Sequence, residues 1–316
     1  MKLLSVTLTP EVGTDDTIEA VASVKCDVKR PWNVVGGETF QTWYKVFGDL
    51  PVGSRTPLIC LHGGPGLAHD YLLPLSDLTA IASIPVIFYD QIGGGRSTHL
   101  PNKPKSFWTV DLFIDELLNV ITYFGIQDSF GILGHSWGGM LGAEFDVRRR
   151  SEGLRHLILT NSLASHALWV QSIIELLEPF PQEVKDAMAA GWDDLKRLAP
   201  AMRQFHAKHG CTVKPMPKEF TDPIDGALGE GGDPTVEIAM WTGELKEWSI
   251  IDRTHLIRTP TLLINGRADI AQDFVVRPFF QGIPRVKWRT FELSSHTPML
   301  EERETFVQEV LEFLGA

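Results

Sequence analysis

Polar and apolar residues alternate near the start of the chain. Between Thr17 and Val28 nearly every second residue is apolar, and polar side chains occupy most of the positions between them. This period-2 pattern predicts a β-strand with one buried face. Residues 40–47 predict a second strand, after a turn at residues 33–38. We expect these two strands to form an antiparallel start to a sheet.

Short, wholly apolar segments then recur along the chain. Such segments are typical of strands covered on both faces. Between two of them, apolar residues at helical spacing predict a helix from Val110 to Phe124, and Gly125 is placed to end it. Strands that alternate with helices predict βαβ units and a mainly parallel sheet of the α/β class. The apolar segments are residues 57–61, 84–89, 130–133, 157–159 and 261–264.

This alternation is interrupted between about residues 164 and 250. The segment is rich in helix-forming residues but contains no strand–helix unit. We therefore predict a helical cap at 164–250, inserted into a core of residues 1–163 and 251–316 and lying over the carboxyl ends of the strands. Its tryptophans are expected mainly in the interior of the cap, away from any ligand: Trp169, Trp192, Trp241 and Trp248.

Composition and charge narrow the class of protein. With 43% hydrophobic and 22% charged residues among 316, the chain is typical of a soluble globular protein. A net charge of −11 argues against binding to nucleic acid or to an anionic membrane. The N-terminal apolar run is too short for a secretory signal, and no stretch is long enough to span a bilayer. We therefore expect a cytoplasmic protein.

The cysteines and metal-binding residue types predict neither disulfides nor a metal centre. Cys26, Cys60 and Cys211 are scattered, and no cluster of histidine, cysteine and acidic residues has metal-ligand spacing. We expect reduced thiols, no metal and no cofactor. Cys60 falls in a buried strand, which leaves Cys211 as the exposed thiol.

A serine lies between a predicted strand and a predicted helix. Residues 134–139 read GHSWGG, after the apolar segment 130–133 and before the helix-like segment 140–145. This is the arrangement of a nucleophile elbow, in which a tight turn projects the serine hydroxyl and flanking glycines avoid clashes with the backbone. We predict Ser136 as a catalytic nucleophile.

A serine nucleophile needs a base and a group that orients the base. In sheets of this kind the acid and then the histidine follow the serine along the chain. Asp269 lies just past the strand at 261–264, and His296 lies past a further strand and before the final helix, at 302–314. We predict His296 as the base and Asp269 as its partner, in preference to the nearby Asp273.

Acyl transfer also requires hydrogen-bond donors for the oxyanion of the tetrahedral intermediate. The N–H of Trp137, at the start of a helix, is the first predicted donor. The second is expected from residues 62–66 (HGGPG), where the glycines allow close approach; we choose the N–H of Gly64, with Gly63 as the alternative. The glycines at 93–95 lack the features of a phosphate or dinucleotide loop.

Together these motifs resemble one known family. The combination is HGGPG at 62–66, DQIGGGRS at 90–97, GHSWGG at 134–139, GRAD at 266–269 and SH at 295–296. It is similar to the proline iminopeptidases and the related L-amino-acid amidases of the α/β-hydrolase fold. The resemblance covers residues 41–164 and 251–314 and fades in the predicted cap. It implies hydrolysis of small amides through an acyl-enzyme on Ser136.

The chain departs from that family at two positions. Gly94 stands where the family usually has cysteine, and Ile270 stands where some members have a glutamate that holds the substrate's amino group. The resemblance implies that a second amine-binding glutamate lies in the cap, and Glu237 and Glu244 are the candidates. Trp241 and Ile270 complete the predicted substrate contacts.

Three functions are compatible with these residues. The first is an aminopeptidase that removes one N-terminal residue, or an amidase of free amino-acid amides. The second is an esterase or lactonase that acts on a small neutral substrate, such as a secondary metabolite. The third is a ligand-binding receptor with a hydrolase pocket, which the complete set of catalytic residues disfavours. The sequence leaves the oligomeric state open.

Overall fold

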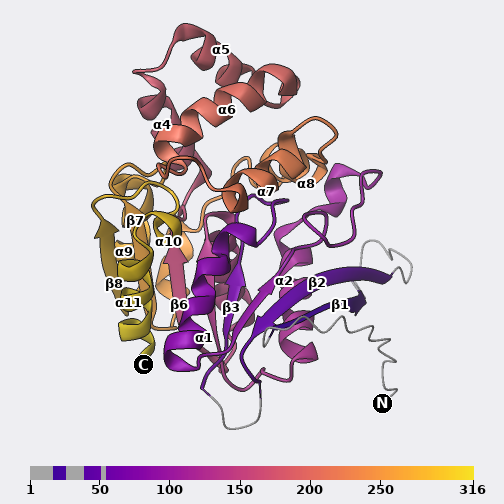
Figure 1. Ribbon diagram of the computed structural model, residues 1–316, viewed down its shortest axis with the longest axis vertical. Helices are drawn as coiled ribbons and strands as arrows, with labels where there is room; N and C mark the ends of the chain where they lie inside the picture. Colours follow the sequence, from indigo (N-terminus) through magenta and orange to yellow (C-terminus); the bar gives the residue numbers. More distant parts are fainter. Residues whose placement is uncertain (1–16, 26–38, 51–54) are drawn as a thin grey trace.

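One mixed sheet organises the computed structural model, which describes residues 17–25, 39–50 and 55–316, with the side chains of residues 17–25 and 39 excepted. In the described chain the sheet has eight strands in the order β1-β2-β4-β3-β5-β6-β7-β8 (Figure 1). The strands are β1 (Thr17–Lys25), β2 (Thr39–Phe47), β3 (Leu58–Leu61), β4 (Val86–Tyr89), β5 (Phe130–His135), β6 (Leu154–Thr160), β7 (Thr261–Gly266) and β8 (Val286–Phe291).

The pairing of the strands confirms the predicted α/β class. β1 is antiparallel to β2, and β2 is antiparallel to β4. All other neighbours pair in parallel. The predicted turn at residues 33–38, the buried face of the first strand, the N-terminal apolar run and Cys26 lie outside the described part of the chain.

The apolar strands are covered on both faces because successive side chains enter different cores. In β3, Ile59 and Leu61 pack into one hydrophobic core, and Leu58 and Cys60 pack into the other. The first core is closed by α2 (Val110–Tyr123), α3 (Trp137–Arg149) and α9 (Asp273–Gly282). The second is closed by α1 (Asp77–Ala82) and α11 (Arg303–Leu314).

Local signals set the ends of α2 as the sequence predicts. The hydroxyl of Thr109 accepts a hydrogen bond from the N–H of Leu112 at 3.2 Å, which satisfies one free donor of the first turn. Gly125 follows the helix with a φ of +66°, a conformation that glycine adopts without strain.

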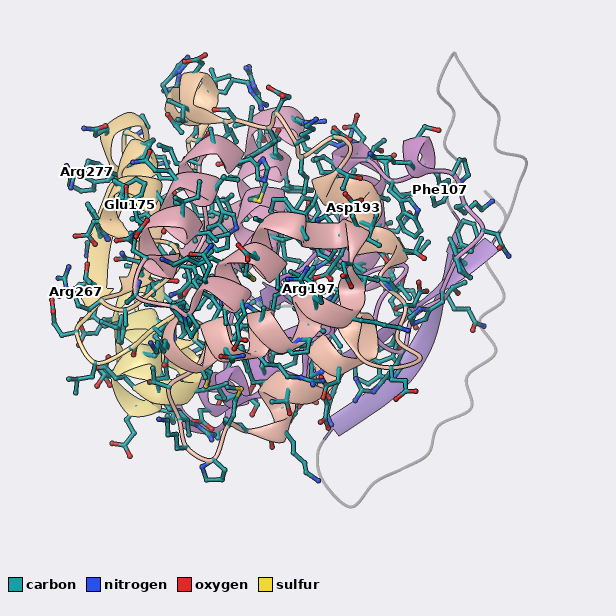
Figure 2. All side chains as sticks on the ribbon, turned by 90° about the horizontal axis from the view of Figure 1, so that it is seen from above. Phe107, Glu175, Asp193, Arg197, Arg267 and Arg277 are labelled. Carbon is teal, nitrogen blue, oxygen red and sulfur yellow. The ribbon has the colours of Figure 1, made fainter. Side chains whose placement is uncertain are left out.

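A helical segment fills the interval between β6 and β7. It contains α4 (His166–Leu177), α5 (Gln182–Ala190), α6 (Leu195–His209), α7 (Lys218–Leu228) and α8 (Thr235–Trp241). Its two ends meet, because Ser165 and Ser249 form an isolated antiparallel bridge. Figure 1 shows these helices above the carboxyl ends of the strands, and Figure 2, seen from above, shows Glu175, Asp193 and Arg197 on this layer. We refer to residues 164–250 as the cap.

The remaining short elements are helical turns: η1 (Asp70–Ser76), η2 (Lys105–Phe107), η3 (Gly191–Asp193), η4 (Ile251–Leu256) and α10 (Pro298–Glu301). Among the residues described, no helix is both long and apolar enough to cross a membrane.

Candidate active site

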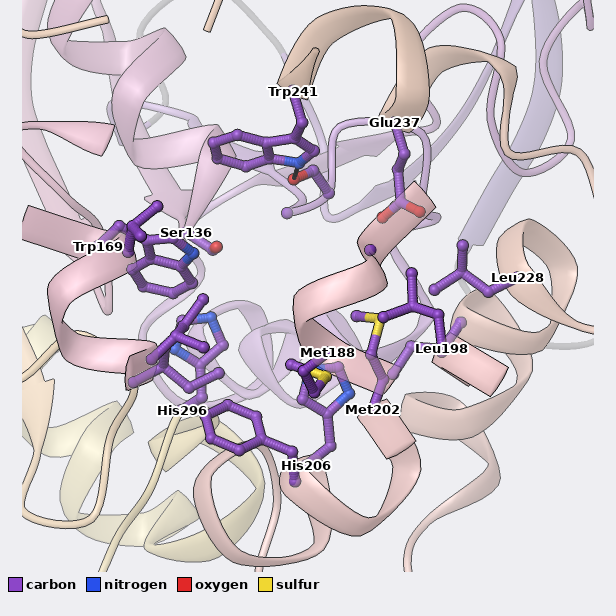
Figure 3. Close-up of a pocket in the computed structure, with 18 of the residues that line it drawn as sticks. Ser136, Trp169, Met188, Leu198, Met202, His206, Leu228, Glu237, Trp241 and His296 are labelled. Carbon is purple, nitrogen blue, oxygen red and sulfur yellow. Dashed lines mark hydrogen bonds between the residues drawn. The ribbon is translucent and has the colours of Figure 1, made fainter. Parts of the chain in front are cut away.

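A cavity of about 840 Å³ lies between the cap and the carboxyl edge of the sheet. Ser136 and His296 line it from the core, and Trp169, Glu237 and Trp241 line it from the cap. Figure 3 shows the hydroxyl of Ser136 directed into the cavity, with His296 and Trp169 on its side and Glu237 across from it. The cavity thus gathers side chains from segments far apart in the sequence.

Ser136 lies on a strained turn between β5 and α3. Its φ and ψ are 54° and −118°, a conformation that a residue with a side chain rarely adopts. The turn is tight enough to require glycine on either side. A Cβ at Gly134 would lie 2.2 Å from the carbonyl oxygen of Gly138, and one at Gly138 would lie 2.2 Å from that of Leu61. Strand β5 and helix α3 therefore hold the serine at the cavity floor.

Asp269 and His296 meet at the same edge of the sheet. The Nδ1 atom of His296 lies 2.6 Å from Oδ1 of Asp269, whose side chain is buried. The competing acid, Asp273, instead accepts hydrogen bonds from Asn265 and Arg267. Of the two acids that the sequence offers, Asp269 is the one in contact with His296.

Asn161 is a site residue that the sequence analysis missed. Its Nδ2 atom donates to Oδ2 of Asp269 at 2.7 Å and to the carbonyl oxygen of Ser295 at 3.1 Å. It therefore fixes the carboxylate and the backbone next to His296 together. A signal was available, because Asn161 directly follows the last residue of β6, at the edge where the other site residues were expected.

The two backbone N–H groups chosen first from the sequence are available to donate hydrogen bonds to a ligand. The N–H groups of Trp137 and Gly64 make no hydrogen bond to any other described residue. The alternative, Gly63, was wrong, because its N–H already donates to the hydroxyl of Tyr71 at 2.6 Å. Trp137 also stands at the N-terminus of α3, where the helix dipole favours a negative charge.

Of the two cap glutamates predicted to bind the substrate's amine, Glu237 and Glu244, only Glu237 lines the cavity. Its side chain is buried, and it makes no hydrogen bond to a described residue. Burial raises the pKa of the Glu237 carboxyl to about 8. The prediction for Glu244 was wrong, because its Oε2 accepts the N–H of Val110 at 2.9 Å and so caps helix α2.

The expectation that the tryptophans lie mainly in the interior of the cap was also wrong. Trp169, Trp192 and Trp241 line the cavity, as does Ile270. Trp248 alone among the four is away from the cavity, with its Nε1 bonded to Glu144 at 2.9 Å. The spacing of aromatic residues along a helix shows that one face is apolar, but not whether that face meets other side chains or a cavity.

The thiols differ from expectation at one position. Cys60 is buried as predicted, but Cys211 is buried too, at 1% exposure, because it packs into the core closed by α11. At Gly94 a Cβ would lie 2.5 Å from the carbonyl oxygen of Leu67, so this backbone leaves no room for the cysteine of the related family. Within the described ranges, no group of three His, Cys, Asp or Glu residues could hold a metal ion.

Comparison with known proteins identifies the family of this chain. Residues 56–303 match the model of the family described as alpha/beta hydrolase fold, so the chain belongs to that family and is a serine hydrolase. Its similarity to curated proline iminopeptidases places it in the proline iminopeptidase family. The relative from Clostridioides difficile is 30% identical over 290 residues, which covers 88% of this chain and 95% of that protein.

Two solved structures are also similar over most of their length. The crystal structure of VinJ has a TM-score of 0.80 and 38% sequence identity, covering 93% of this chain and 98% of VinJ. The proline iminopeptidase of Mycobacterium smegmatis has a TM-score of 0.77 and 39% identity, covering 87% of this chain and 95% of that one.

Proposed function

We propose that the protein hydrolyses the amide bond that follows an amino-acid residue with a free amino group, as an aminopeptidase or an amidase. The observation that carries this proposal is Glu237, a buried carboxyl without a hydrogen-bond partner in the described chain, in the same cavity as Ser136. A buried charge must be paired, and the α-ammonium group of an amino-acid residue is the cation that such a carboxylate would hold. The names of the relatives support the same chemistry.

The reaction assigns a role to each residue at the cavity floor. His296 takes the proton of the Ser136 hydroxyl as the oxygen attacks the substrate carbonyl, and Asp269 stabilises the imidazolium that forms. The N–H groups of Trp137 and Gly64 stabilise the oxyanion. His296 then protonates the departing amine, and water hydrolyses the acyl-enzyme by the same steps.

The far part of the cavity suggests the size and character of the substrate. Away from Ser136 it is lined largely by apolar side chains, among them Met188, Leu198, Met202 and Leu228, which Figure 3 shows below Glu237. At about 840 Å³ the cavity is in the upper part of the range for small-molecule sites. We propose that one side of the scissile amide carries a large apolar group. The substrate is thus a small molecule or short peptide.

An esterase or lactonase activity is the second candidate. Ile270 provides no second carboxylate, and the raised pKa of Glu237 keeps it mostly uncharged at neutral pH in the empty cavity. A cavity in this state also accepts a neutral substrate.

The test compares kcat/KM for an amino-acid amide and its N-acetylated form, together with a short-chain ester. We expect the free amine to be preferred, by less than the roughly 10⁴-fold typical of sites that enforce a polar contact strictly. Glu237→Gln should remove most of this preference. Glu244→Gln, which keeps an oxygen for the N–H of Val110, is the matched control and should leave it unchanged.

Three results would change the assignment. Equal kcat/KM for the two amides, with faster ester cleavage, would favour the esterase. A preference above about 10⁴-fold would mean that another acid replaces the missing one. A preference that survives Glu237→Gln would place the amine site elsewhere.

For the compartment we propose the cytoplasm, which the two free, reduced thiols Cys60 and Cys211 support.

A further inference from the structure

A chain of hydrogen bonds joins the loop that carries Gly64 to the residue His296. The N–H of Gly63 donates to the hydroxyl oxygen of Tyr71 at 2.6 Å. That hydroxyl lies 2.8 Å from Nδ1 of His135, and Nε2 of His135 lies 2.7 Å from the carbonyl oxygen of His296. All of the side chains in this chain are buried.

The direction of every bond in the chain is fixed by its two ends. A backbone carbonyl only accepts, so Nε2 of His135 must carry the proton that it gives to His296. A neutral imidazole then accepts at Nδ1, so the Tyr71 hydroxyl donates there and accepts from Gly63. Burial holds the pKa of His135 well below its usual range, which keeps the ring in this neutral form. The arrangement has one consistent pattern of protons.

His62 fixes the other side of Gly63. Its Nε2 accepts the N–H of Gln91 at 2.9 Å, so its Nδ1 carries the proton and donates to the carbonyl oxygen of Gly63 at 2.8 Å. That carbonyl shares a planar peptide unit with the N–H of Gly64, and the two point in opposite directions. Holding the Gly63 carbonyl therefore sets the direction of the Gly64 N–H, one of the free donors of the site.

We propose that Tyr71 and His135 are positioning residues that hold the oxyanion donor and the catalytic base in a fixed relation. Tyr71 anchors the loop before Gly64, and His135 anchors the backbone of His296. The inference rests on the proposed roles of Gly64 and His296. It concerns the serine chemistry and is independent of how the substrate's amine is held.

A conservative substitution can separate the positioning role of the Tyr71 hydroxyl from the packing of the Tyr71 ring. The Tyr71 ring also packs edge-on against His135 and Phe220, with ring centroids 5.0 Å and 6.4 Å apart. Tyr71→Phe keeps those ring contacts and removes only the hydroxyl. Tyr123→Phe is the matched control, because it removes a hydroxyl that bonds Tyr44 at 3.1 Å, outside the residues that line the cavity.

The experiment measures kcat and KM of both variants with an amino-acid anilide and with 4-nitrophenyl acetate. Removing an oxyanion donor outright costs about 10²–10³ in kcat, so displacing one should cost about tenfold to a hundredfold. We expect that loss in kcat for Tyr71→Phe on both substrates, with KM within about threefold of wild type. Inhibition by phenylboronic acid, which forms a tetrahedral adduct on Ser136, should weaken by a similar factor. Tyr123→Phe should change none of these values.

A second variant tests whether the two residues act as one unit. His135→Phe keeps an aromatic ring and removes both nitrogens. If the hydrogen-bond chain acts as proposed, a double variant that combines Tyr71→Phe with His135→Phe should lose little more activity than the worse single variant. The reason is that each change breaks the same connection. Losses that multiply would overturn the proposal.

The remaining outcomes also decide. If Tyr71→Phe keeps kcat within about twofold of wild type, the proposal is wrong whether or not His135→Phe folds. A lower Tm with unchanged kcat would assign Tyr71 to stability alone. If the wild type cleaves the ester but no amide, the proposed amidase function fails and the ester data still test Tyr71. A wild type that cleaves neither substrate and is not inhibited by the boronic acid would overturn both.

Discussion

The ionisation of Glu237 links pH to substrate binding. Burial raises the pKa of this carboxyl to about 8 from an ordinary value of 4.5, so the empty site is mostly protonated at pH 7. A bound ammonium group favours the carboxylate and lowers that pKa. Binding of a protonated amine should therefore release close to one proton at pH 7, and the affinity should rise as the pH approaches 8.

Calorimetry in buffers of different ionisation enthalpy measures this proton release, and Glu237→Gln should abolish it.

The raised pKa of Glu237 also affects the stability of the fold. A raised carboxyl pKa stabilises the fold below pH 4.5, and that contribution is lost as the pH rises through 8. The free energy of unfolding of Glu237→Gln should therefore rise relative to that of the wild type between these two pH values, by on the order of 4 kcal/mol at pH 8. Proton uptake on binding, or no change in relative stability with pH, would contradict the assignment.

Among individual site residues, those marked by a local motif or by the end of a strand could be predicted from the sequence. Ser136 follows from its glycine-flanked turn, and Asp269 and His296 follow from their place after strands. The choice between Glu237 and Glu244 could not follow from the sequence, because Glu237 lies in α8 and Glu244 lies just after it, and the packing of this part of the cap decides which of them faces inward. Tyr71 and His135 carry no motif of their own, since the role proposed for them depends on hydrogen bonds between distant segments, such as the one between these two residues, which are 64 positions apart.

Among the elements, α2 shows how a helix end is satisfied twice. Thr109 holds the N–H of Leu112, and Glu244 of the cap holds the N–H of Val110. Thr109→Ala should lower the free energy of unfolding by about 1 kcal/mol, the usual cost of losing such a cap. Urea denaturation measures this loss.

Thr122→Ala is the control for that experiment. Thr122 lies in the same helix, and its hydroxyl donates to the carbonyl oxygen of Leu118 on an exposed surface. Alanine favours a helix interior, so this change should cost little. An equal loss for the two variants would mean that the cap hydrogen bond contributes nothing specific.

The strands and core helices were predictable for a physical reason that the cap does not share. Strands buried on both faces need unbroken apolar segments, and β3, β4, β5 and β7, which are buried along their whole length, contain them. In the cap the sequence predicts helices correctly, yet the orientation of Trp169, Trp192 and Trp241 toward a cavity depends on how those helices pack against the core.

For the whole molecule, the two described cysteines predict resistance to thiol reagents. Cys60 and Cys211 are both buried, and burial raises the pKa of each thiol, which lowers the fraction of reactive thiolate. Activity should therefore survive incubation with a small mercurial under native conditions. Mass spectrometry should find both residues unmodified until the protein is unfolded. Rapid inactivation that substrate prevents would contradict this prediction.

The meeting of the cap's two ends at Ser165 and Ser249 has an evolutionary consequence. A segment whose ends lie side by side can be exchanged for one of different length without pulling apart the strands that flank it. Selection can thus vary what is cleaved while leaving the catalytic apparatus in place. Contacts between the cap and the core limit this freedom. In one of them the indole of Trp241 donates to the carbonyl oxygen of Gly64 at 3.1 Å, so each new cap must supply that bond or leave the loop without it. Trp241 is the position at which an engineer grafting a foreign cap onto this core should begin.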